Sequence, residues 1–147
     1  SSGTASYSGE YAGIAFENYN TPSQAAYVLT TGDVSVQATF TSNRVDGKIT
    51  NRQVFGTDGS AEPSWSAANI QMNSTTLTSD GDYQATLSGG GLRSAGNTTN
   101  TNNGRVIGII DGINGQSTAG ILFLNYSLTG SNGDFALTER GAFSASR

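Results

Sequence analysis

The sequence contains no cysteine and no histidine. Without cysteine, the chain has no disulfide, zinc–thiolate site or thiol nucleophile. Without histidine, it lacks His-based triads, His-ligated metals and the usual general base near neutral pH. Charge is also sparse: only 12% of residues are charged, and the seven basic residues are scattered, whereas a nucleic-acid surface needs a basic stripe. We therefore expect a non-enzymatic protein with no cofactor, no metal and no nucleic-acid partner.

Long apolar runs are missing as well, so no transmembrane helix is expected. Gly, Ser, Thr and Asn are abundant instead, and they suit turns and the wet faces of sheets better than helices. This composition is typical of secreted or cell-surface β proteins. The opening SSGTASYSG resembles a mature N-terminus or tether. We expect an extracellular or bacterial outer-membrane-surface location, residues 1–6 as an N-terminal arm, and room for a lipid anchor ahead of Ser1.

The clearest structural pattern is the stretch VSVQATFTSNRVDGKITNR at residues 34–52. Apolar residues from Val34 to Phe40 occupy every second position, which is the period of a half-buried strand. A polar turn follows at 41–44, and the alternation resumes at Val45. The pattern predicts an antiparallel hairpin whose second strand places one set of side chains in solvent: Asp46, Lys48, Thr50 and Arg52.

The rest of the chain repeats this design at intervals of roughly 10–15 residues, without a helical period. It predicts a single all-β domain over residues 1–147, with about eight to ten strands in an antiparallel barrel or, alternatively, a β-sandwich. The low-complexity stretch 88–104 is expected to be a long mobile loop. The last two strands are expected at 134–138 and 141–145, with Glu139-Arg140 between them. The apolar run 118–128 has either two buried faces or one that meets a partner.

The central hairpin resembles a known family. An apolar strand ending in Phe40, a polar turn and then V-x-G-x-I-T-N from Val45 resemble the repeated unit of the transferrin-binding-protein-B-like β-barrel. The closing strand of that family, A-x-E-x-G-G-x-F, is matched in part by residues 136–143, although 118–123 could hold its place instead. The resemblance implies an eight-stranded barrel outside the cell. Members bind host iron proteins, complement regulators or haem-related ligands through loops or a second domain, so no binding residue is carried over.

Aromatic residues are the first candidates for a site. Tyrosines gather near the N-terminus, where they could form a recognition patch, ligate haem iron or cover glycines in strands. Trp65 could stack on a sugar, fill a partner's pocket or lie half-buried at a barrel rim. Arg93 and Asn97 lie in the expected loop 88–104. The candidate ligand- or partner-binding residues are Tyr7, Tyr11, Tyr19, Trp65, Arg93 and Asn97.

The acidic residues give weaker candidates. Asp80 and Asp82 offer calcium only two of the six to eight oxygens that it takes, and an Asp-Gly turn explains them equally well. Asp58 and Glu62 could do acid–base chemistry, but a glycosidase pair also needs a cleft. Solvated loop charges are the simpler interpretation of both pairs.

Two functions fit these observations. The first is a cell-surface or secreted bacterial binding barrel that recognises an unidentified protein or small molecule through its loops. The second is a self-assembling subunit of an extracellular fibre, pilus or surface layer, in which the N-terminal arm adds a strand to a neighbouring copy. The first predicts a monomer and the second a homo-oligomer or filament.

Overall fold

The structure is a computed structural model, and it describes residues 3–18, 27–94, 97–111, 115–129 and 135–147. These residues form ten strands and no helix. None of the described residues belongs to a helix that could cross a membrane. The strands are β1 (Thr4–Asn18), β2 (Tyr27–Thr39), β3 (Arg44–Phe55), β4 (Trp65–Ala67), β5 (Ile70–Thr76), β6 (Asp82–Gly89), β7 (Leu92–Ser94), β8 (Asn97–Asp111), β9 (Ser117–Thr129) and β10 (Phe135–Ser146).

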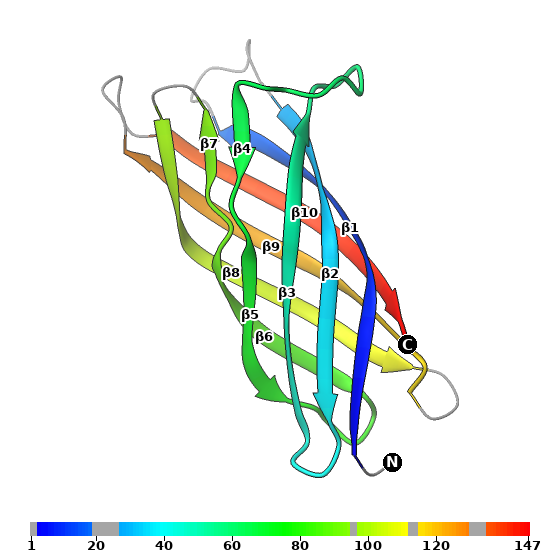
Figure 1. Cartoon of the computed structure of the whole chain (residues 1–147). Coiled ribbons are helices and arrows are strands. Elements are labelled where there is room, and N and C mark those ends of the chain that lie inside the picture. Colours follow the sequence, from blue (N-terminus) through cyan, green and yellow to red (C-terminus); the bar gives the residue numbers. More distant parts are fainter. Residues whose placement is uncertain (1–2, 19–26, 95–96, 112–114, 130–134) are drawn as a thin grey trace.

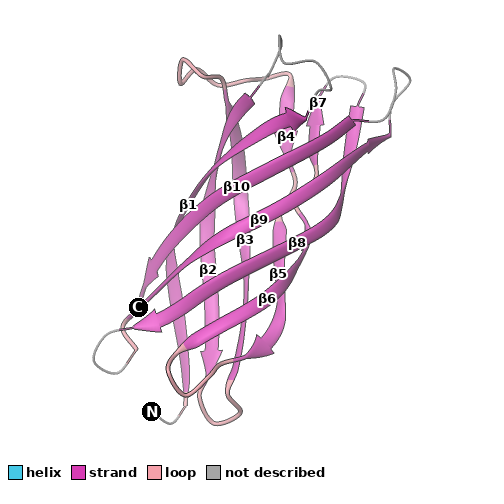
Figure 2. Cartoon of the chain, turned by 180° about the vertical axis from the view of Figure 1, so that it is seen from behind, coloured by secondary structure: helices cyan, strands magenta, loops and turns pink. Residues whose placement is uncertain are grey.

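Eight of these strands close into an antiparallel barrel (Figures 1 and 2). Going around the wall, the order is β1, β2, β3, β5, β6, β8, β9 and β10. Two pairings complete the circle: β10 with β1, and β8 with β9. The barrel predicted from the sequence is therefore confirmed, and its closure excludes the β-sandwich.

The two remaining strands form a short ribbon at one end of the barrel. β4 pairs with β7, and β7 in turn pairs with the first residues of β8. In Figure 1 this ribbon lies near the upper end, whereas the N- and C-termini lie near the lower end. The ribbon therefore marks one end of the barrel, opposite both chain ends.

The predicted hairpin is formed by β2 and β3. Val36 faces Gly47 and Val34 faces Ile49 across the pair, and all four are buried in the barrel. Lys48 lies outside and is exposed, as the alternation predicted. The apolar side of each strand thus faces the barrel interior, and the polar side faces solvent.

Aromatic rings inside the barrel lie over glycines on neighbouring strands. A Cβ added at Gly141 would be 2.3 Å from the ring of Tyr11, and one added at Gly108 would be 2.3 Å from the ring of Tyr83. Both distances are far below a van der Waals contact, so only glycine leaves room for the ring. This matches the glycine-covering interpretation of the N-terminal tyrosines.

The barrel interior is filled by these rings and by aliphatic side chains. The described residues leave an internal cavity of about 10 Å³ next to Ile70, Met72 and Leu122. That volume is close to the space of a single water molecule, whereas ligand pockets usually measure roughly 300–1,000 Å³. This part of the interior has no room for a small-molecule ligand.

Two sequence-based expectations are wrong. The stretch 88–104 is not one long loop, because it contains β7 and the first part of β8, which pairs with β9. Polar residues with low strand propensity are held here by ladder hydrogen bonds.

The C-terminal segment is not two strands either. β10 runs unbroken through Glu139 and Arg140, paired on both sides. In addition, residues 4–6 of the expected arm begin β1 and pair with β2.

The fit between Tyr83 and Gly108 can be tested by Gly108→Ala. We expect the free energy of unfolding to fall by about 1–3 kcal/mol, because the added methyl group overpacks the barrel and displaces the ring. Urea denaturation measures the change. Gln84→Ala, at the exposed neighbouring position, should stay within about 0.5 kcal/mol of wild type. Equal stability of both variants would contradict the close packing.

Candidate functional site

A buried carboxylate organises the polar part of the barrel interior. Glu139 on β10 is fully buried and accepts five hydrogen bonds from four side chains. Arg52 donates Nη2 to Oε1 at 2.6 Å and to Oε2 at 2.8 Å. The hydroxyls of Tyr11 and Thr30 donate to Oε1 at 2.6 Å each, and that of Tyr126 donates to Oε2 at 2.5 Å. We call these five residues the Glu139 cluster.

The Glu139 cluster joins the barrel wall to the segments beside the β4–β7 ribbon. Its members come from β1, β2, β3, β9 and β10. Arg52 also donates Nη1 to the carbonyl oxygens of Ala68 and Gly90, at 2.9 Å each. Ala68 follows β4 and Gly90 precedes β7. One guanidinium group therefore holds both sides of the ribbon to the inside of the barrel.

Arg52 reaches the interior because β3 contains a bulge. Thr31 faces Gln53 and Asp33 faces Thr50, so two residues of β3 lie opposite one residue of β2. Asn51 takes up the irregularity with a positive φ of 50°, a conformation that asparagine tolerates. The extra residue shifts the alternation by one position. The prediction that Arg52 faces solvent is therefore wrong.

The sequence did contain a sign of each misplaced residue. Buried positions in β3 fall on odd numbers up to Ile49 and then on the even-numbered Val54, and such a change of phase is typical of a bulge. In β10, Leu137 and Phe143 define an inward row that also contains Glu139. The charge of Glu139 led to the incorrect prediction of a break between two strands. Tyr126, also missed, lies on the inward row of β9.

The ionisation of the cluster follows from its burial and its donors. Burial acts to raise the pKa of Glu139, but the Arg52 charge and the hydrogen bonds from Thr30, Tyr11 and Tyr126 outweigh it, so that pKa is lowered. Burial, reinforced by the Glu139 charge, raises the pKa of both tyrosines. The cluster therefore holds an ionised carboxylate and two protonated phenols. Its ion pair has no exposed surface, which makes it a structural centre rather than a site open to a ligand.

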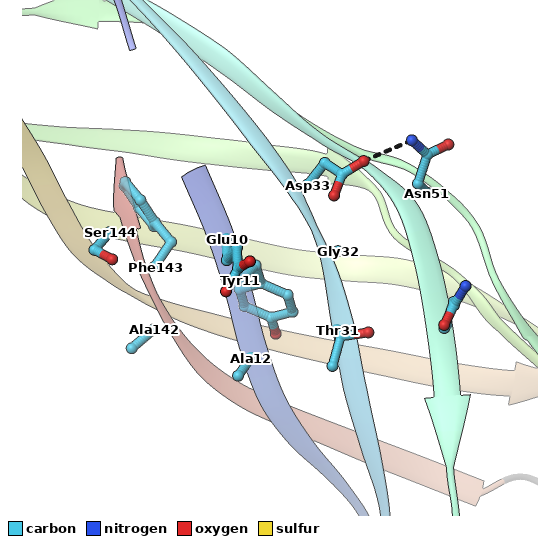
Figure 3. Close-up of a pocket in the computed structure, with 11 residues that line it drawn as sticks. Glu10, Tyr11, Ala12, Thr31, Gly32, Asp33, Asn51, Ala142, Phe143 and Ser144 are labelled. Carbon is cyan, nitrogen blue, oxygen red and sulfur yellow. Dashed lines mark hydrogen bonds between the residues drawn. The ribbon is translucent and has the colours of Figure 1, made fainter. Parts of the chain in front are cut away.

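Outside the barrel, the clearest hollow lies over β10, β1, β2 and β3 (Figure 3). It measures about 740 Å³. Ala12 and Ala142 are small exposed side chains on neighbouring strands, and Glu10 and Asp33 add two carboxylates beside them. The amide of Asn51 donates to Asp33 Oδ2 at 2.6 Å. The floor of the hollow is formed in part by small apolar side chains, two carboxylates lie beside them, and the hollow is wide open to solvent.

The outer surface of the barrel has two different halves. The outward residues of β3, β5 and β6 are polar, for example Lys48, Asn73 and Gln84. Those of β8, β9, β10 and β1, which we call the outer wall, include four isoleucines that are 40–48% exposed. Cross-strand pairing places Ile107 beside Ile121, Ile121 beside Ala142, and Ala142 beside Ala12. These isoleucines are Ile14, Ile107, Ile109 and Ile121.

The structure divides the described candidates between two places: Tyr7 and Tyr11 lie inside the barrel, whereas Trp65, Arg93 and Asn97 lie on the paired strands β4, β7 and β8. Tyr7 and Tyr11 are 1% and 2% exposed inside the barrel, and Tyr7 donates to the carbonyl of Gly115. Trp65 is partly buried at the start of β4 and packs against the core, and Arg93 is exposed on β7. Asn97 begins β8, but its side chain, like the whole of residue 19, lies outside what the structure describes. Tyr19 therefore has no described position.

Of the acidic candidates, Asp58 and Asp80 lie in turns, Glu62 lies between strands, and Asp82 is the first residue of β6. Asp58 Oδ1 accepts hydrogen bonds from the hydroxyl and backbone nitrogen of Ser60, which lower its pKa. The backbone nitrogen of Asp82 donates to the hydroxyl of Thr78. Within the described ranges, no group of three or more acidic residues lies close enough together to hold a metal ion.

No known protein-family model matches this chain, and no curated protein matches its sequence.

The ion pair can be tested by Glu139→Gln. We expect the free energy of unfolding at pH 7 to fall by about 3–5 kcal/mol, because the change leaves the Arg52 charge buried without its counterion. Urea denaturation provides the measurement. Glu10→Gln, which removes an exposed carboxylate, should change it by less than about 0.5 kcal/mol. Similar values for the two variants would show that Glu139 does not stabilise the barrel.

The same pair makes stability depend on pH. The folded-state pKa of Glu139 lies below its ordinary value of 4.5, so its contribution is complete above that value and is lost as pH falls through the lowered pKa. We expect the stability difference between wild type and Glu139→Gln to be constant near neutral pH and to shrink below about pH 4. Denaturation series at several pH values would measure it. A difference that grows on acidification would contradict this assignment.

Proposed function

We propose that this chain is a non-enzymatic binding module of the bacterial cell surface or extracellular space, and that it recognises a protein through the outer wall of its barrel. The observation that carries the proposal is the gathering of exposed isoleucines on one half of the barrel. Extended apolar surface on a soluble β protein is typical of an interaction site. The other half, with its amides, hydroxyls and Lys48, has the composition of an ordinary solvated face.

Two further features support binding on the outside. The internal cavity next to Met72 is about 10 Å³, so a ligand held there, as in barrels with an open lumen, would not fit. The Glu139 cluster satisfies its carboxylate with protein donors, and the side chains of its ion pair have no exposed surface. The resemblance to the transferrin-binding-protein-B-like barrel is consistent with a surface-displayed binding protein. Recognition by loops, which that resemblance implies, stays a prediction for the connections between strands.

A protein partner fits the outer wall better than a sugar does. Sugar sites usually offer an exposed aromatic platform beside their polar groups. Near the hollow of Figure 3 the aromatic residues are Tyr11 and Phe143, which are 2% and 6% exposed. The outer wall also contains Phe123, but that ring is half-buried, and the guanidinium groups of Arg105 and Arg140 lie over it at 5.4 and 5.1 Å from its centre. Aliphatic side chains with charged residues at the margin are typical of protein–protein contacts.

Selection of peptides from a random 12-residue phage library can test this proposal. We expect enriched peptides to bind the immobilised chain. Their affinity for the Ile121→Glu variant should be at least about tenfold lower, because a charge then replaces one of the exposed isoleucines of the outer wall. They should bind Gln84→Glu, on the polar half, as they bind wild type. Failure to enrich peptides, or equal binding to both variants, would overturn the proposal.

A further inference from the structure

We infer that the protein partner inserts an arginine into the hollow of Figure 3, where Glu10 and Asp33 together bind its guanidinium group. The inference rests on the proposed function, because the hollow overlaps the outer wall. It goes further by naming the chemistry of the partner: an extended segment with an arginine about four residues from an aliphatic residue. Its basis is the position of two carboxylates beside a floor of small side chains.

The two carboxylates lie directly opposite each other on neighbouring strands, Glu10 on β1 and Asp33 on β2. The Cβ atoms of such a pair are about 4.5–5.5 Å apart, and like charges in these positions destabilise a sheet. Both side chains are exposed, and both line the hollow. A cation bound between them would remove their repulsion and add two attractions, so the pair favours a positively charged partner.

The described part of the chain does not supply this cation. Its one salt bridge joins Arg52 to Glu139 inside the barrel, and Lys48 on the neighbouring β3 forms no ion pair there. Arg140 on β10 is directed toward β9 instead, because its guanidinium lies 5.1 Å from the centre of the Phe123 ring. A partner is therefore the remaining source of positive charge for the two carboxylates.

Arginine fits this pair better than lysine does. A guanidinium group has five N–H donors in a planar fork and can reach two carboxylates at once, whereas an ammonium group is a compact, strongly hydrated charge. Asp33 accepts the amide of Asn51 with Oδ2, which holds this carboxylate in place and leaves Oδ1 for a second donor. Glu10 adds its own carboxylate on the other side, so the fork finds acceptors on both strands.

The floor of the hollow suits the apolar stem of an arginine. Ala12 follows Glu10 on the same face of β1, and Ala142 lies opposite Ala12 on β10. Because these side chains are small, they leave a depression of about 740 Å³. Long cationic side chains commonly lay their methylene groups along apolar surface and keep the charged group in a polar environment. Stem and head of the arginine thus each meet a surface of matching chemistry.

The exposed isoleucines place the aliphatic part of the partner. Ile121 on β9 lies beside Ala142. The path from Ile121 to the midpoint between the two carboxylates crosses about two and a half strand spacings and one row, which is about 14 Å or four residues of extended chain. The barrel wall is convex here (Figure 2), so a flexible segment can follow it more closely than a flat rigid surface can.

Peptides enriched from the random 12-residue library, made synthetically and titrated by fluorescence anisotropy, test the inference. We expect them to contain an arginine about four residues from an aliphatic residue. Glu10→Gln and Asp33→Asn should each weaken binding by about threefold or more, and the double variant by at least about tenfold. Asp80→Asn also removes an exposed carboxylate, but it lies in a turn that Asn-Gly forms equally well, and it should leave binding unchanged.

Replacing the peptide arginine by citrulline separates a direct contact from a change in the fold. Citrulline keeps the shape of the side chain without its charge, so it should weaken binding to wild type by at least about tenfold. It should cause little further loss with the double variant, because the contact is already absent there. Equal losses with both proteins would show that the carboxylates do not contact the arginine. Thermal unfolding of each variant checks its fold.

The remaining outcomes separate the two proposals. Enriched peptides without arginine, or peptides that bind Glu10→Gln and Asp33→Asn as tightly as wild type, would overturn the inference. An equal loss with Asp80→Asn would do so as well, since it would show a general attraction to the acidic chain. If such peptides still lose affinity for Ile121→Glu, the proposed function stands. If the library yields no binding peptides, both proposals fail.

Discussion

The ion pair between Arg52 and Glu139 is the constraint on which the rest of the structure depends. A charge inside a barrel is tolerated only when it is paired and fully hydrogen-bonded. Glu139 meets this requirement with donors from four barrel strands, and Arg52 uses its Nη1 on the segments beside the β4–β7 ribbon. Removing either partner would leave the other charge in a dry interior. The pair thus connects β3 to β10 through the barrel interior and holds the segments beside the ribbon to the barrel wall.

That arrangement also decides where the molecule can meet a partner. Rings over glycines fill one part of the interior, the Glu139 cluster fills another, and the cavity next to Met72 measures about 10 Å³. The recognition proposed above therefore uses the outside, where the two halves of the barrel differ. Residues such as Gln84 keep one half solvated. The isoleucines of the outer wall give the other half the apolar surface that a partner can cover.

Much of this fold could be predicted from residue alternation, because a strand with one buried face shows its period directly. The hairpin around Val36 and Ile49 and the approximate number of strands followed from it. Arg52 could not be placed, since a bulge shifts the period without changing composition. Glu139 was taken for a connection because a charge on an inward row contradicts the usual pattern. Ile121 could not be distinguished from the core residues of the run 118–128, because local sequence does not show which face of a strand is covered.

Closure of the barrel through β1 and β10 has a consequence for how the chain reaches its native state. Ser8 faces Ser146 in the finished barrel, so one edge of β1 has no hydrogen-bonding partner until β10 has been added. Folds dominated by such distant pairings fold slowly, commonly over milliseconds to seconds. During synthesis, β1 to β9 would leave the ribosome before β10. The edges of β1 and β9 would then be unpaired, and the apolar side chains that face the barrel interior would be exposed. A chaperone that covers strand edges until β10 emerges would therefore protect this protein at the stage when aggregation through those edges is easiest.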